Sequence, residues 1–574
     1  MEYKSENRIC QNCKKDFVIE PDDFLFYEKI KVPPPTFCPE CRLQRMVAWR
    51  NDWHMFRKKD ARTGEVIFSL FPEESPVKIY DRDYWISDAW DPVEYGVDYD
   101  FSKPFFEQFK ELLSKVPMPS HSMTNVVNSH YCANASSIKN CYLCRGVAYT
   151  EDSAYLIWDQ ASKQCFDSHM TNGCELSYGN VNTIICYKTF FSVDCESCQE
   201  MILCKDCVGC NSCIASIGLR NKSYCIFNEQ YSKEEYLKKI NKFNLGSYKS
   251  IENLKVKAYQ HWLNYPQKYI HGYHNVNASG DYIYESKNSK NCYRVRGVED
   301  SKFVQNILTG PVKDCYDYTN WGDNTELVYE SLIVGEGVYN VKFTVQSYVN
   351  VQNLSYCVFC HNSSDLFGCV SLRKKQHCIL NKQYTKEEYE KIVPKIIKHM
   401  KSTKEYGEFF PASLSPFPYQ ITQAYEFFPL NKEEAEVVGF LWYETVKQDY
   451  KITLIATQIP NHIRDVDVNI LNEVIECKHT GNCKHECTGA FRIIQMELDF
   501  CKRMNIPLPR LCTNCRHYER LSLRNSPNFY HRKCMCDKKH THHEGKCEVE
   551  FETSYAPDRA EVVYCEKCYQ NEIY

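Results

Sequence analysis

Polar turn residues and apolar residues alternate at short intervals through the middle of the chain. Short cues of Asn, Ser, Asp or Cys followed by an aromatic or apolar residue recur about every ten or eleven residues, as at Asn140-Cys141, Asp152-Ser153, Gln164-Cys165, Gly173-Cys174 and Asp194-Cys195. Short strands with a turn at each cue would give this spacing. Two such units per coil predict a β-solenoid of roughly 20 residues a turn, and a pair of β-sandwiches is the alternative.

This patterned region occurs twice, over residues 128–240 and 277–392. Asn140-Cys-Tyr-x-x-Arg-Gly-Val matches the same pattern at Asn291, and Cys225-Ile-Phe-Asn-Glu-Gln-Tyr matches Cys378-Ile-Leu-Asn-Lys-Gln-Tyr. The offset is 151 residues at one end and 153 at the other, so the copies run almost ungapped. Each copy ends in a capping box, Ser232 with Glu235 and Thr385 with Glu388, which predicts a terminal helix.

Apolar periodicity predicts a few short elements outside the duplication. A hairpin is expected from Val66–Phe71 and Val77–Tyr84, and a helix is expected after an N-cap at Ser102. Asn431-Lys-Glu-Glu opens an amphipathic helix, and Asp465–Ile475 is typical of another short helix.

Composition narrows the class of protein. The 574 residues are 43% hydrophobic and carry a formal charge of −4, so no global field favours nucleic acid or a membrane surface. No long apolar run predicts a membrane span, and the first residues lack the apolar core of a signal peptide. Reduced thiols are therefore expected among the 34 cysteines, in a cytoplasmic metal protein rather than a disulfide scaffold.

The first cysteine-rich stretch predicts a zinc ribbon. Cys10-x2-Cys13 and Cys38-x2-Cys41 supply four thiolates for a tetrahedral ion, and Phe17 can pack beneath it. A unit this short needs the metal for folding energy.

A second ribbon is predicted near the C-terminus, because Cys487-x3-Phe491 and Cys512-x2-Cys515-Arg516 repeat the spacing of the first. The position aligned with Cys10 is a lysine. We choose the nearest thiol, which gives the ligand set Cys483, Cys487, Cys512 and Cys515. The alternatives are Cys477, His479 and His485.

A third ribbon is predicted from Cys547, Cys565 and Cys568, with His543 as the fourth ligand because neutral imidazole binds zinc well. Cys534-x-Cys536 with His540 or His542 either closes a fourth site or donates to this one. The cofactor expected is Zn²⁺, about three ions per chain.

The densest cysteines fall at the end of the first copy. Cys204, Cys207, Cys210 and Cys213 have a spacing near that of a ferredoxin run, but one residue short before the fourth thiol. The second copy keeps only the first two, as Cys357 and Cys360. Buried free thiols, an additional zinc and an iron–sulfur cluster are the three interpretations.

Basic residues follow the ribbons and predict a nucleic-acid surface. They are Arg42, Arg45 and Arg50 after the first ribbon, and Arg516, Arg520 and Arg524 after the second. Basic side chains beside aromatic ones can grip phosphates and stack bases. RNA is the leading partner on this interpretation, and protein is the partner otherwise. The alternative is a helix whose aromatic residues face the core.

The N-terminal ribbon resembles the bacterial "probable zinc-ribbon" domain, through Cys10, Cys13, Phe17, Phe26-Tyr27 and Cys38-Pro-Glu-Cys41-Arg42. Most of the chain is similar to a multi-zinc-ribbon family of candidate-phyla bacteria. Four motifs carry this resemblance: Cys38-Pro-Glu-Cys41-Arg42, Cys225-Ile-Phe-Asn-Glu-Gln-Tyr, Phe551-Glu-Thr-Ser-Tyr-Ala-Pro and Tyr564-Cys-Glu-Lys-Cys-Tyr. The resemblance implies domain content rather than an activity.

The predicted fold is mainly β with small α parts, in which zinc ribbons at both ends flank two tandem β-solenoid-like repeats. The predicted boundaries are a ribbon at 1–50, an α+β connector at 51–127, repeats at 128–245 and 277–395 with a linker at 246–276, helices and linker at 396–476, and ribbons at 477–533 and 534–574.

A binding scaffold is the function predicted, because closed four-ligand zinc sites are structural. The sequence lacks H-E-x-x-H and a phosphate-binding glycine loop, and we assign no catalytic residue. An enzyme with an acidic site on the solenoid face is the alternative, at Glu151-Asp152 and Glu299-Asp300, although turn chemistry also explains these residues.

Overall fold

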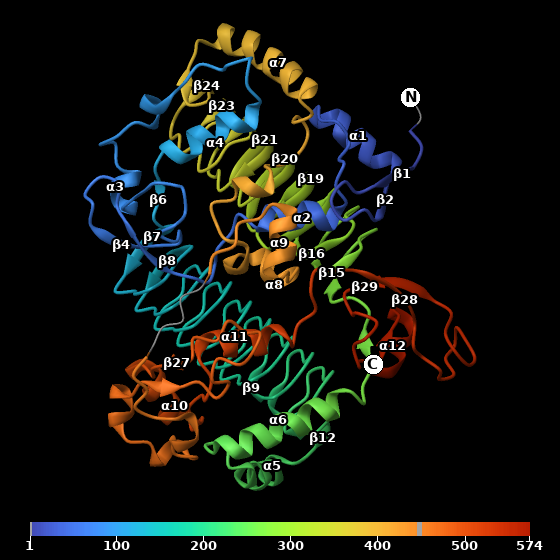
Figure 1. The fold of residues 1–574 in the computed structure, drawn as a ribbon. Coiled ribbons are helices and arrows are strands. Elements are labelled where there is room, and N and C mark those ends of the chain that lie inside the picture. Colours follow the sequence, from blue (N-terminus) through green and yellow to red (C-terminus); the bar gives the residue numbers. More distant parts are fainter. Residues whose placement is uncertain (1–2, 445–449, 574) are drawn as a thin grey trace.

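A computed structural model describes residues 3–444 and 450–573. The chain has mainly strands with fewer helices (Figure 1). Cysteine clusters lie near both ends of it. The helices are α1 Pro21–Ile30, α2 Pro39–Val47, α3 Arg82–Ile86, α4 Phe105–Lys115, α5 Lys233–Ile240, α6 Tyr248–Trp262, α7 Lys386–Ser402, α8 Gln423–Phe427, α9 Lys432–Val438, α10 Gln495–Met504, α11 Thr513–Leu521 and α12 Glu566–Ile573.

Residues 123–227 form a stack of turns that we call the first stack. Each turn takes twelve residues and pairs in parallel with the next turn, as in Met123 with Ala135 and Lys139 with Glu151. The longer pairings belong to β7 Met123–Val127, β8 Ala135–Lys139, β9 Gln199–Ile202, β10 Asn211–Ile214, β11 Cys225–Ile226 and β12 Glu229–Gln230. The longer turn predicted from sequence is therefore wrong.

The backbone of the first stack turns a corner at every third residue. Asn140, Leu143, Tyr149 and Asp152 all have φ between 51° and 55°, and Gly146 has φ 63°. Left-handed corners at this spacing divide each turn into four sides of three residues. Such short sides leave few consecutive strand residues, which explains why most of the pairings are single bridges.

Small polar and sulfur-containing side chains fill the interior of the first stack. The Cys198 thiol donates to the Cys207 carbonyl at 3.3 Å, and the Cys204 thiol donates to the Cys213 carbonyl at 3.4 Å. Both thiols are fully buried and free. A thiol is compact enough for the narrow interior, and its weak donor satisfies a carbonyl that water cannot reach.

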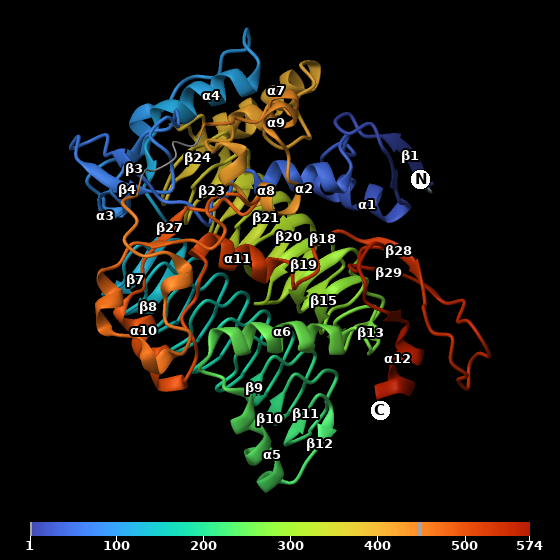
Figure 2. The same ribbon diagram turned by 60° about the horizontal axis from the view of Figure 1, so that its bottom comes forward.

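Residues 272–383 form a second stack with longer strands and a less regular register (Figure 2). The spacing between parallel partners varies along it, from Gly272 with Ile283 to Lys302 with Tyr316. Its strands are β14 Gly272–Tyr273, β15 Gly280–Tyr284, β16 Cys292–Arg296, β17 Val298–Glu299, β18 Lys302–Ile307, β19 Val312–Thr319, β20 Gly322–Leu332, β21 Gly335–Val345, β22 Gln352–Ser355, β23 Ser364–Phe367, β24 Gln376–Ile379 and β25 Lys382–Gln383.

Each stack ends in the helix that its capping box predicts. Ser232 caps α5 and Thr385 caps α7. In each case the glutamate three residues on accepts a hydrogen bond from the backbone amide of the cap residue in return. Within the stretch predicted as a linker at 246–276, α6 covers one side of the first stack through Leu254, Ala258 and Trp262 (Figure 2). The segment around Phe409, Phe410 and Tyr419 is buried beside the second stack.

The small strands outside the stacks pair two by two, as hairpins or as short ladders. They are β1 Glu6–Ile9, β2 Asp16–Ile19, β3 Phe56–Lys59, β4 Val66–Ser69, β5 Ile79–Tyr80, β6 Met118–Pro119, β13 Gln267–Lys268, β26 Ile475–Glu476, β27 Ala490–Phe491, β28 Tyr530–Lys533, β29 Glu550–Thr553 and β30 Val563–Tyr564. No helix within the described ranges is long and apolar enough to cross a membrane.

Several predicted element boundaries need correction. Helix α4 begins after Pro104 rather than Ser102, because proline fits the first turn and Ser102 instead donates to Asp100. The expected hairpin of Val66–Phe71 with Val77–Tyr84 is wrong, because β4 pairs antiparallel with β3 and β5 pairs in parallel with β6. The second predicted strand is also cut short, since Asp81 caps α3. The predicted helix at Asn431 is confirmed as α9. The range 465–475 contains the end of a 3₁₀ turn at Ile463–Asp465, a second 3₁₀ turn at Val468–Asn472 and part of β26 instead of the predicted helix.

Candidate metal centres

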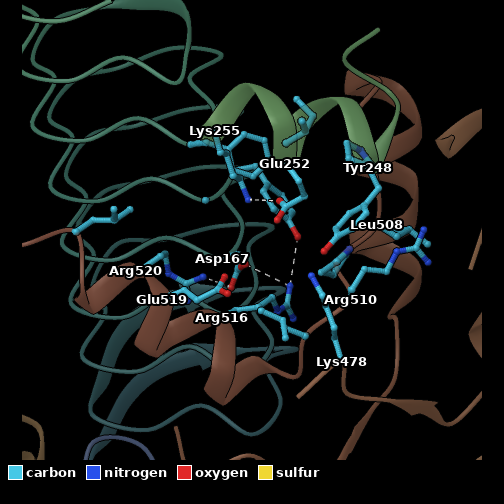
Figure 3. Close-up of a pocket in the computed structure, with 18 of the residues that line it drawn as sticks. Asp167, Tyr248, Glu252, Lys255, Lys478, Leu508, Arg510, Arg516, Glu519 and Arg520 are labelled. Atoms are coloured by element: carbon cyan, nitrogen blue, oxygen red, sulfur yellow. Dashed lines mark hydrogen bonds and ion pairs between the residues drawn. The ribbon is translucent and has the colours of Figure 1, made fainter. Parts of the chain in front are cut away.

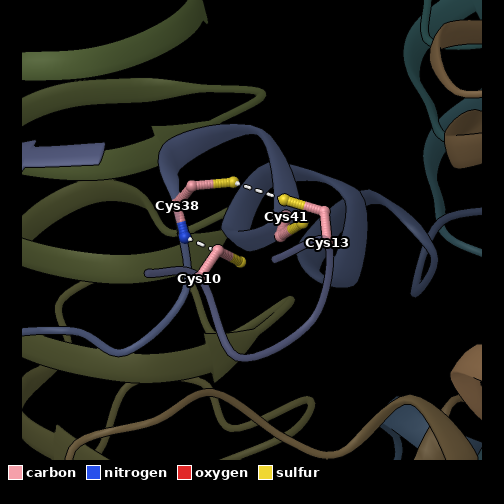
Figure 4. A group of neighbouring side chains, drawn as sticks. All are labelled: Cys10, Cys13, Cys38 and Cys41. Atoms are coloured by element: carbon pink, nitrogen blue, oxygen red, sulfur yellow. Dashed lines mark hydrogen bonds between the residues drawn. The ribbon is translucent and has the colours of Figure 1, made fainter. Parts of the chain in front are cut away.

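The first ribbon brings its four predicted cysteines together. The β1–β2 hairpin carries Cys10 and Cys13, and the start of α2 carries Cys38 and Cys41 (Figure 4). All four sulfurs lie within 4.8 Å of one another, with Cys13 Sγ 3.7 Å from Cys38 Sγ. The Cys38 amide donates to Cys10 Sγ at 3.3 Å, and the Asn12 side chain donates to Cys41 Sγ at 3.4 Å. Hydrogen bonding with Cys38 lowers the pKa of Cys41 to about 5, which favours the thiolate that a metal needs.

The second ribbon closes with Cys477, not with the predicted Cys483. The group is Cys477, Cys487, Cys512 and Cys515. Cys477 Sγ lies 3.8 Å from Cys515 Sγ, and Cys512 Sγ lies 3.9 Å from Cys487 Sγ. The Cys512 amide donates to Cys477 Sγ at 3.2 Å, as Cys38 does to Cys10. Cys483 belongs instead to a neighbouring group, with His479, His485 and Cys515.

The third ribbon closes with Cys534, not with the predicted His543. The group is Cys534, Cys547, Cys565 and Cys568, and Cys547 Sγ lies 4.0 Å from Cys565 Sγ. The Cys565 amide donates to Cys534 Sγ at 3.2 Å. His543 lies in an adjacent group with Cys536, His540 and Cys568.

A local signal could have identified both missed ligands. In every ribbon the first cysteine directly follows a short strand: Cys10 follows β1, Cys477 follows β26 and Cys534 follows β28. The number of residues between the first two ligands differs among the ribbons. A fixed spacing counted back from the second ligand therefore does not find the first one. The choice of Cys483 and His543 from the sequence rested on that spacing.

The six arginines predicted to contact nucleic acid are all buried, with exposed fractions between 1% and 8%. Arg42 Nε lies 2.9 Å from Asp317 of the second stack, and Arg516 Nη1 lies 2.8 Å from Glu497 and 3.4 Å from Asp167 of the first stack. Arg45 contacts Glu408, and Arg50 contacts Asp52. Arg520 contacts Asp167, and Arg524 lies over the ring of Phe427. All of them except Arg50 join a ribbon to another part of the molecule, and none of the six lies on the basic surface predicted.

The acidic pairs weighed as an enzyme site are part of the corners of the stacks. Asp152 accepts a hydrogen bond from the Asn140 amide at 2.8 Å, and Asp300 accepts one from Asn288 at 3.0 Å. Glu151 Oε2 lies 3.8 Å from Lys163 Nζ. The turn-chemistry interpretation therefore accounts for both aspartates.

A cavity of about 370 Å³ lies between α6, α11 and the first stack (Figure 3). Lys255 Nζ contacts Glu252 at 2.8 Å, and Arg516 and Arg520 contact Asp167. Burial raises the pKa of Glu519 in its wall. Because opposite charges pair across this wall, the cavity presents no uniform field to an anion or a cation.

No family model matches the chain, and no curated protein matches it. One matching solved structure is a candidate acetyltransferase from Desulfovibrio desulfuricans G20, at 11% identity and a TM-score of 0.10. The alignment covers 41% of this chain and 63% of that one, so it spans less than two thirds of the matched protein. A superposition this poor establishes no shared fold. The residues themselves define the class: a protein with several cysteine-rich groups able to hold metal ions.

Proposed function

We propose that the protein is a zinc-binding modular scaffold, with a structural zinc ion in each of the three four-cysteine groups. The sulfur separations carry this proposal. Zinc–sulfur bonds of about 2.3 Å in a tetrahedron place the sulfurs about 3.8 Å apart. Four of the sulfur pairs lie near this distance, 3.7 Å apart in the first ribbon, 3.8 and 3.9 Å in the second and 4.0 Å in the third, and the other pairs of each group lie within 4.8 Å.

The same distances favour a single ion over an iron–sulfur cluster at these groups. A cluster spreads its cysteines over several iron atoms, which separates the sulfurs. Here all four sulfurs of each group lie within 4.8 Å of one another. Four protein ligands close the coordination shell, which is typical of a structural rather than a catalytic zinc.

The two stacks supply the scaffold in this proposal. Their successive turns pair in parallel over residues 123–227 and 272–383, a pattern that we interpret as two β-solenoids. Solenoids offer long faces for binding, and the buried arginines fix the ribbons on them. Protein is the partner class that this arrangement supports, because the arginines predicted to contact RNA are buried and most of them, such as Arg42 and Arg516, pair with carboxylates.

Metal analysis of the purified protein tests the proposal. We expect zinc at three or more ions per chain, without iron and without absorbance near 400 nm, a wavelength region where iron–sulfur centres absorb. The variant Cys41→Ser should lose one equivalent of zinc, whereas Cys501→Ser, at a buried cysteine outside the groups, should lose none. Iron with a brown colour, or zinc below one ion per chain, would overturn the proposal.

Binding assays over a salt series test the partner class. Nucleic acid stays a prediction from sequence, and it requires an affinity for RNA or DNA that falls steeply with salt. An absent or salt-insensitive interaction would leave protein as the partner.

A further inference from the structure

The second and third ribbons differ from the first in one place, the segment between the first two metal ligands. The first ribbon has Cys10-x2-Cys13, the second has Cys477-x9-Cys487 and the third has Cys534-x12-Cys547. The amide-to-sulfur bonds at Cys10, Cys477 and Cys534 show that these cysteines are equivalent. The second and third ribbons therefore contain a longer loop inside an otherwise shared ribbon.

Both longer loops carry additional metal-ligand side chains. The loop of the second ribbon holds His479, Cys483 and His485, and that of the third holds Cys536, His540 and His543. In each case three loop ligands gather around the last cysteine of the ribbon, so that all four donor atoms lie within 4.8 Å of one another. Cys483 Sγ lies 3.7 Å from Cys515 Sγ, and His543 Nε2 lies 3.2 Å from Cys568 Sγ.

The histidines of these loops have ring nitrogens available for coordination. Nδ1 of His479, Nδ1 of His485 and Nε2 of His540 are buried, and they lack a hydrogen-bond partner within the described part of the chain. A buried polar atom without a partner is costly. Neutral imidazole and thiolate are also the donors that zinc prefers.

We propose that each of these two ribbons binds two metal ions that share one cysteine, Cys515 in the second ribbon and Cys568 in the third. This inference rests on the zinc-binding function proposed above. A thiolate sulfur has three lone pairs, so it can bond to two ions at once. Each centre then has five cysteines and two histidines around two ions, and the chain binds five ions instead of three.

Two independent ribbons with this arrangement strengthen the inference. In both ribbons the shared cysteine is the last ligand of the ribbon and lies inside a helix, α11 or α12. The first loop ligand also lies two residues after the first ribbon cysteine in both, as Cys477-x-His479 and Cys534-x-Cys536. The first ribbon has only Gln11 and Asn12 between its first two ligands, so this loop contains no additional cysteine or histidine and the ribbon serves as an internal single-ion reference.

Native mass spectrometry and elemental analysis of the full chain test the proposal. We expect five zinc ions per chain in the unaltered protein. The double variants His479→Ala/His485→Ala and His540→Ala/His543→Ala should each lose one ion and keep four. The matched control is His531→Ala, at an exposed histidine that belongs to neither of these two centres, which should keep five.

Cobalt substitution tests the shared cysteine itself. Two Co²⁺ ions joined by one thiolate couple magnetically, which reduces the electron paramagnetic resonance signal per cobalt. His479→Ala/His485→Ala should restore the signal of the remaining ion at the second ribbon. Unchanged signal per cobalt in both the unaltered protein and the variant would overturn the bridge.

The outcomes separate the two proposals. Three zinc ions per chain in the unaltered protein and in both double variants would overturn the two-ion centres while leaving the zinc scaffold intact. Four ions, with the loss confined to one double variant, would overturn the proposal for the other ribbon. Iron, or no bound metal, would overturn the scaffold itself.

Discussion

Asparagine and aspartate side chains form ladders along the corners of the stacks. Asn128 donates to Asn140 at 2.8 Å, and Asn140 donates to Asp152 at 2.8 Å, one turn further on each time. Asn140 has φ 51°, a left-handed conformation that asparagine tolerates better than most residues. One residue type therefore supports both the corner and the contact between turns.

Replacement of Asn140 tests this double role. Asn140→Ala should destabilise the first stack by about 1–2 kcal/mol, because alanine disfavours the left-handed corner and the two amide contacts are lost. Asn140→Gly should cost less, since glycine adopts the corner freely. Hydrogen exchange of the amides around residues 128–152 measures the effect. The control is the exposed neighbour Lys139→Ala, and an equal effect of Asn140→Ala and this control would contradict the role.

A buried carboxyl inside the first stack predicts a pH dependence. Asp159 accepts hydrogen bonds from Thr150 at 2.8 Å and Ser162 at 2.7 Å, and burial raises its pKa from 3.8 to about 6. The folded state therefore binds this proton more tightly than the unfolded state, so the carboxyl's contribution to stability falls as the pH rises from about 4 to about 6.

Asp159→Asn removes this titration and keeps the shape of the side chain. The variant should gain stability relative to the unaltered protein as the pH rises, by about 2 kcal/mol between pH 4.5 and 7.5. Thermal unfolding at both pH values measures the difference. Other titrations, including metal release, affect both proteins and cancel. A constant difference between the two proteins would show that Asp159 titrates normally.

Cysteines occur in two kinds of element, with different chemistry. In the stacks they are interior side chains bonded to backbone carbonyls, as Cys198 and Cys204 are. In the ribbons they meet at the junction of a strand, a loop and a helix start, where Cys38 and Cys512 precede α2 and α11. The same residue type thus packs in one element and coordinates in the other.

Alkylation of native protein should distinguish the two kinds of cysteine. After zinc is removed with a chelator, iodoacetamide should label ribbon cysteines such as Cys13, Cys483 and Cys487, which are at least partly exposed. Cys204 and Cys213 should stay protected, because they are buried inside the turns. Peptide mass spectrometry measures both, and labelling in denaturant sets the maximum. Equal labelling of Cys13 and Cys204 would contradict the assignment of buried free thiols.

Elements with a fixed local spacing could be predicted from the sequence, and those set by tertiary contacts could not. The pairs Cys10-x2-Cys13 and Cys38-x2-Cys41 need only local turns, so their grouping was correct. The cues at Asn140, Asp152 and Gln164 lie one turn of twelve residues apart, but less regular cues such as Gly173 and Asp194 obscured the turn length. The pairing of Arg42 with Asp317 joins residues that no local pattern connects.

At the scale of the whole molecule, two ribbons attach to the two stacks in the same way. Arg42, directly after the last ligand of the first ribbon, contacts Asp317 of the second stack. Arg516, at the same place in the second ribbon, contacts Asp167 of the first stack. The separation of Asp167 and Asp317 along the chain is close to the offset of the duplication. The chain therefore contains two equivalent units, each a ribbon on a stack.

Aromatic contacts repeat in the same two interfaces. The Phe26 ring of α1 stacks on Tyr316 with centroids 3.9 Å apart, and the Phe500 ring of α10 lies 4.6 Å from Phe166. Phe166 and Tyr316 precede the two aspartates directly. Each unit thus combines an aromatic pair with a buried ion pair. The ribbon that comes first in the chain packs on the later stack, and the ribbon that comes later packs on the earlier one.

The buried ion pair gives the last prediction. Arg42→Met should weaken attachment of the first ribbon by about 3–5 kcal/mol, because it leaves Asp317 buried without its cation. Adding Asp317→Asn should recover much of this loss, since the neutral amide needs no cation. Limited proteolysis of residues 1–50 measures detachment, and zinc content should stay unchanged because the four thiolates are intact. Arg57→Met, at an exposed arginine of β3, is the control. The role of the ion pair would be contradicted if Arg42→Met were as resistant to proteolysis as the control. It would also be contradicted if Arg42→Met/Asp317→Asn were as sensitive as Arg42→Met alone.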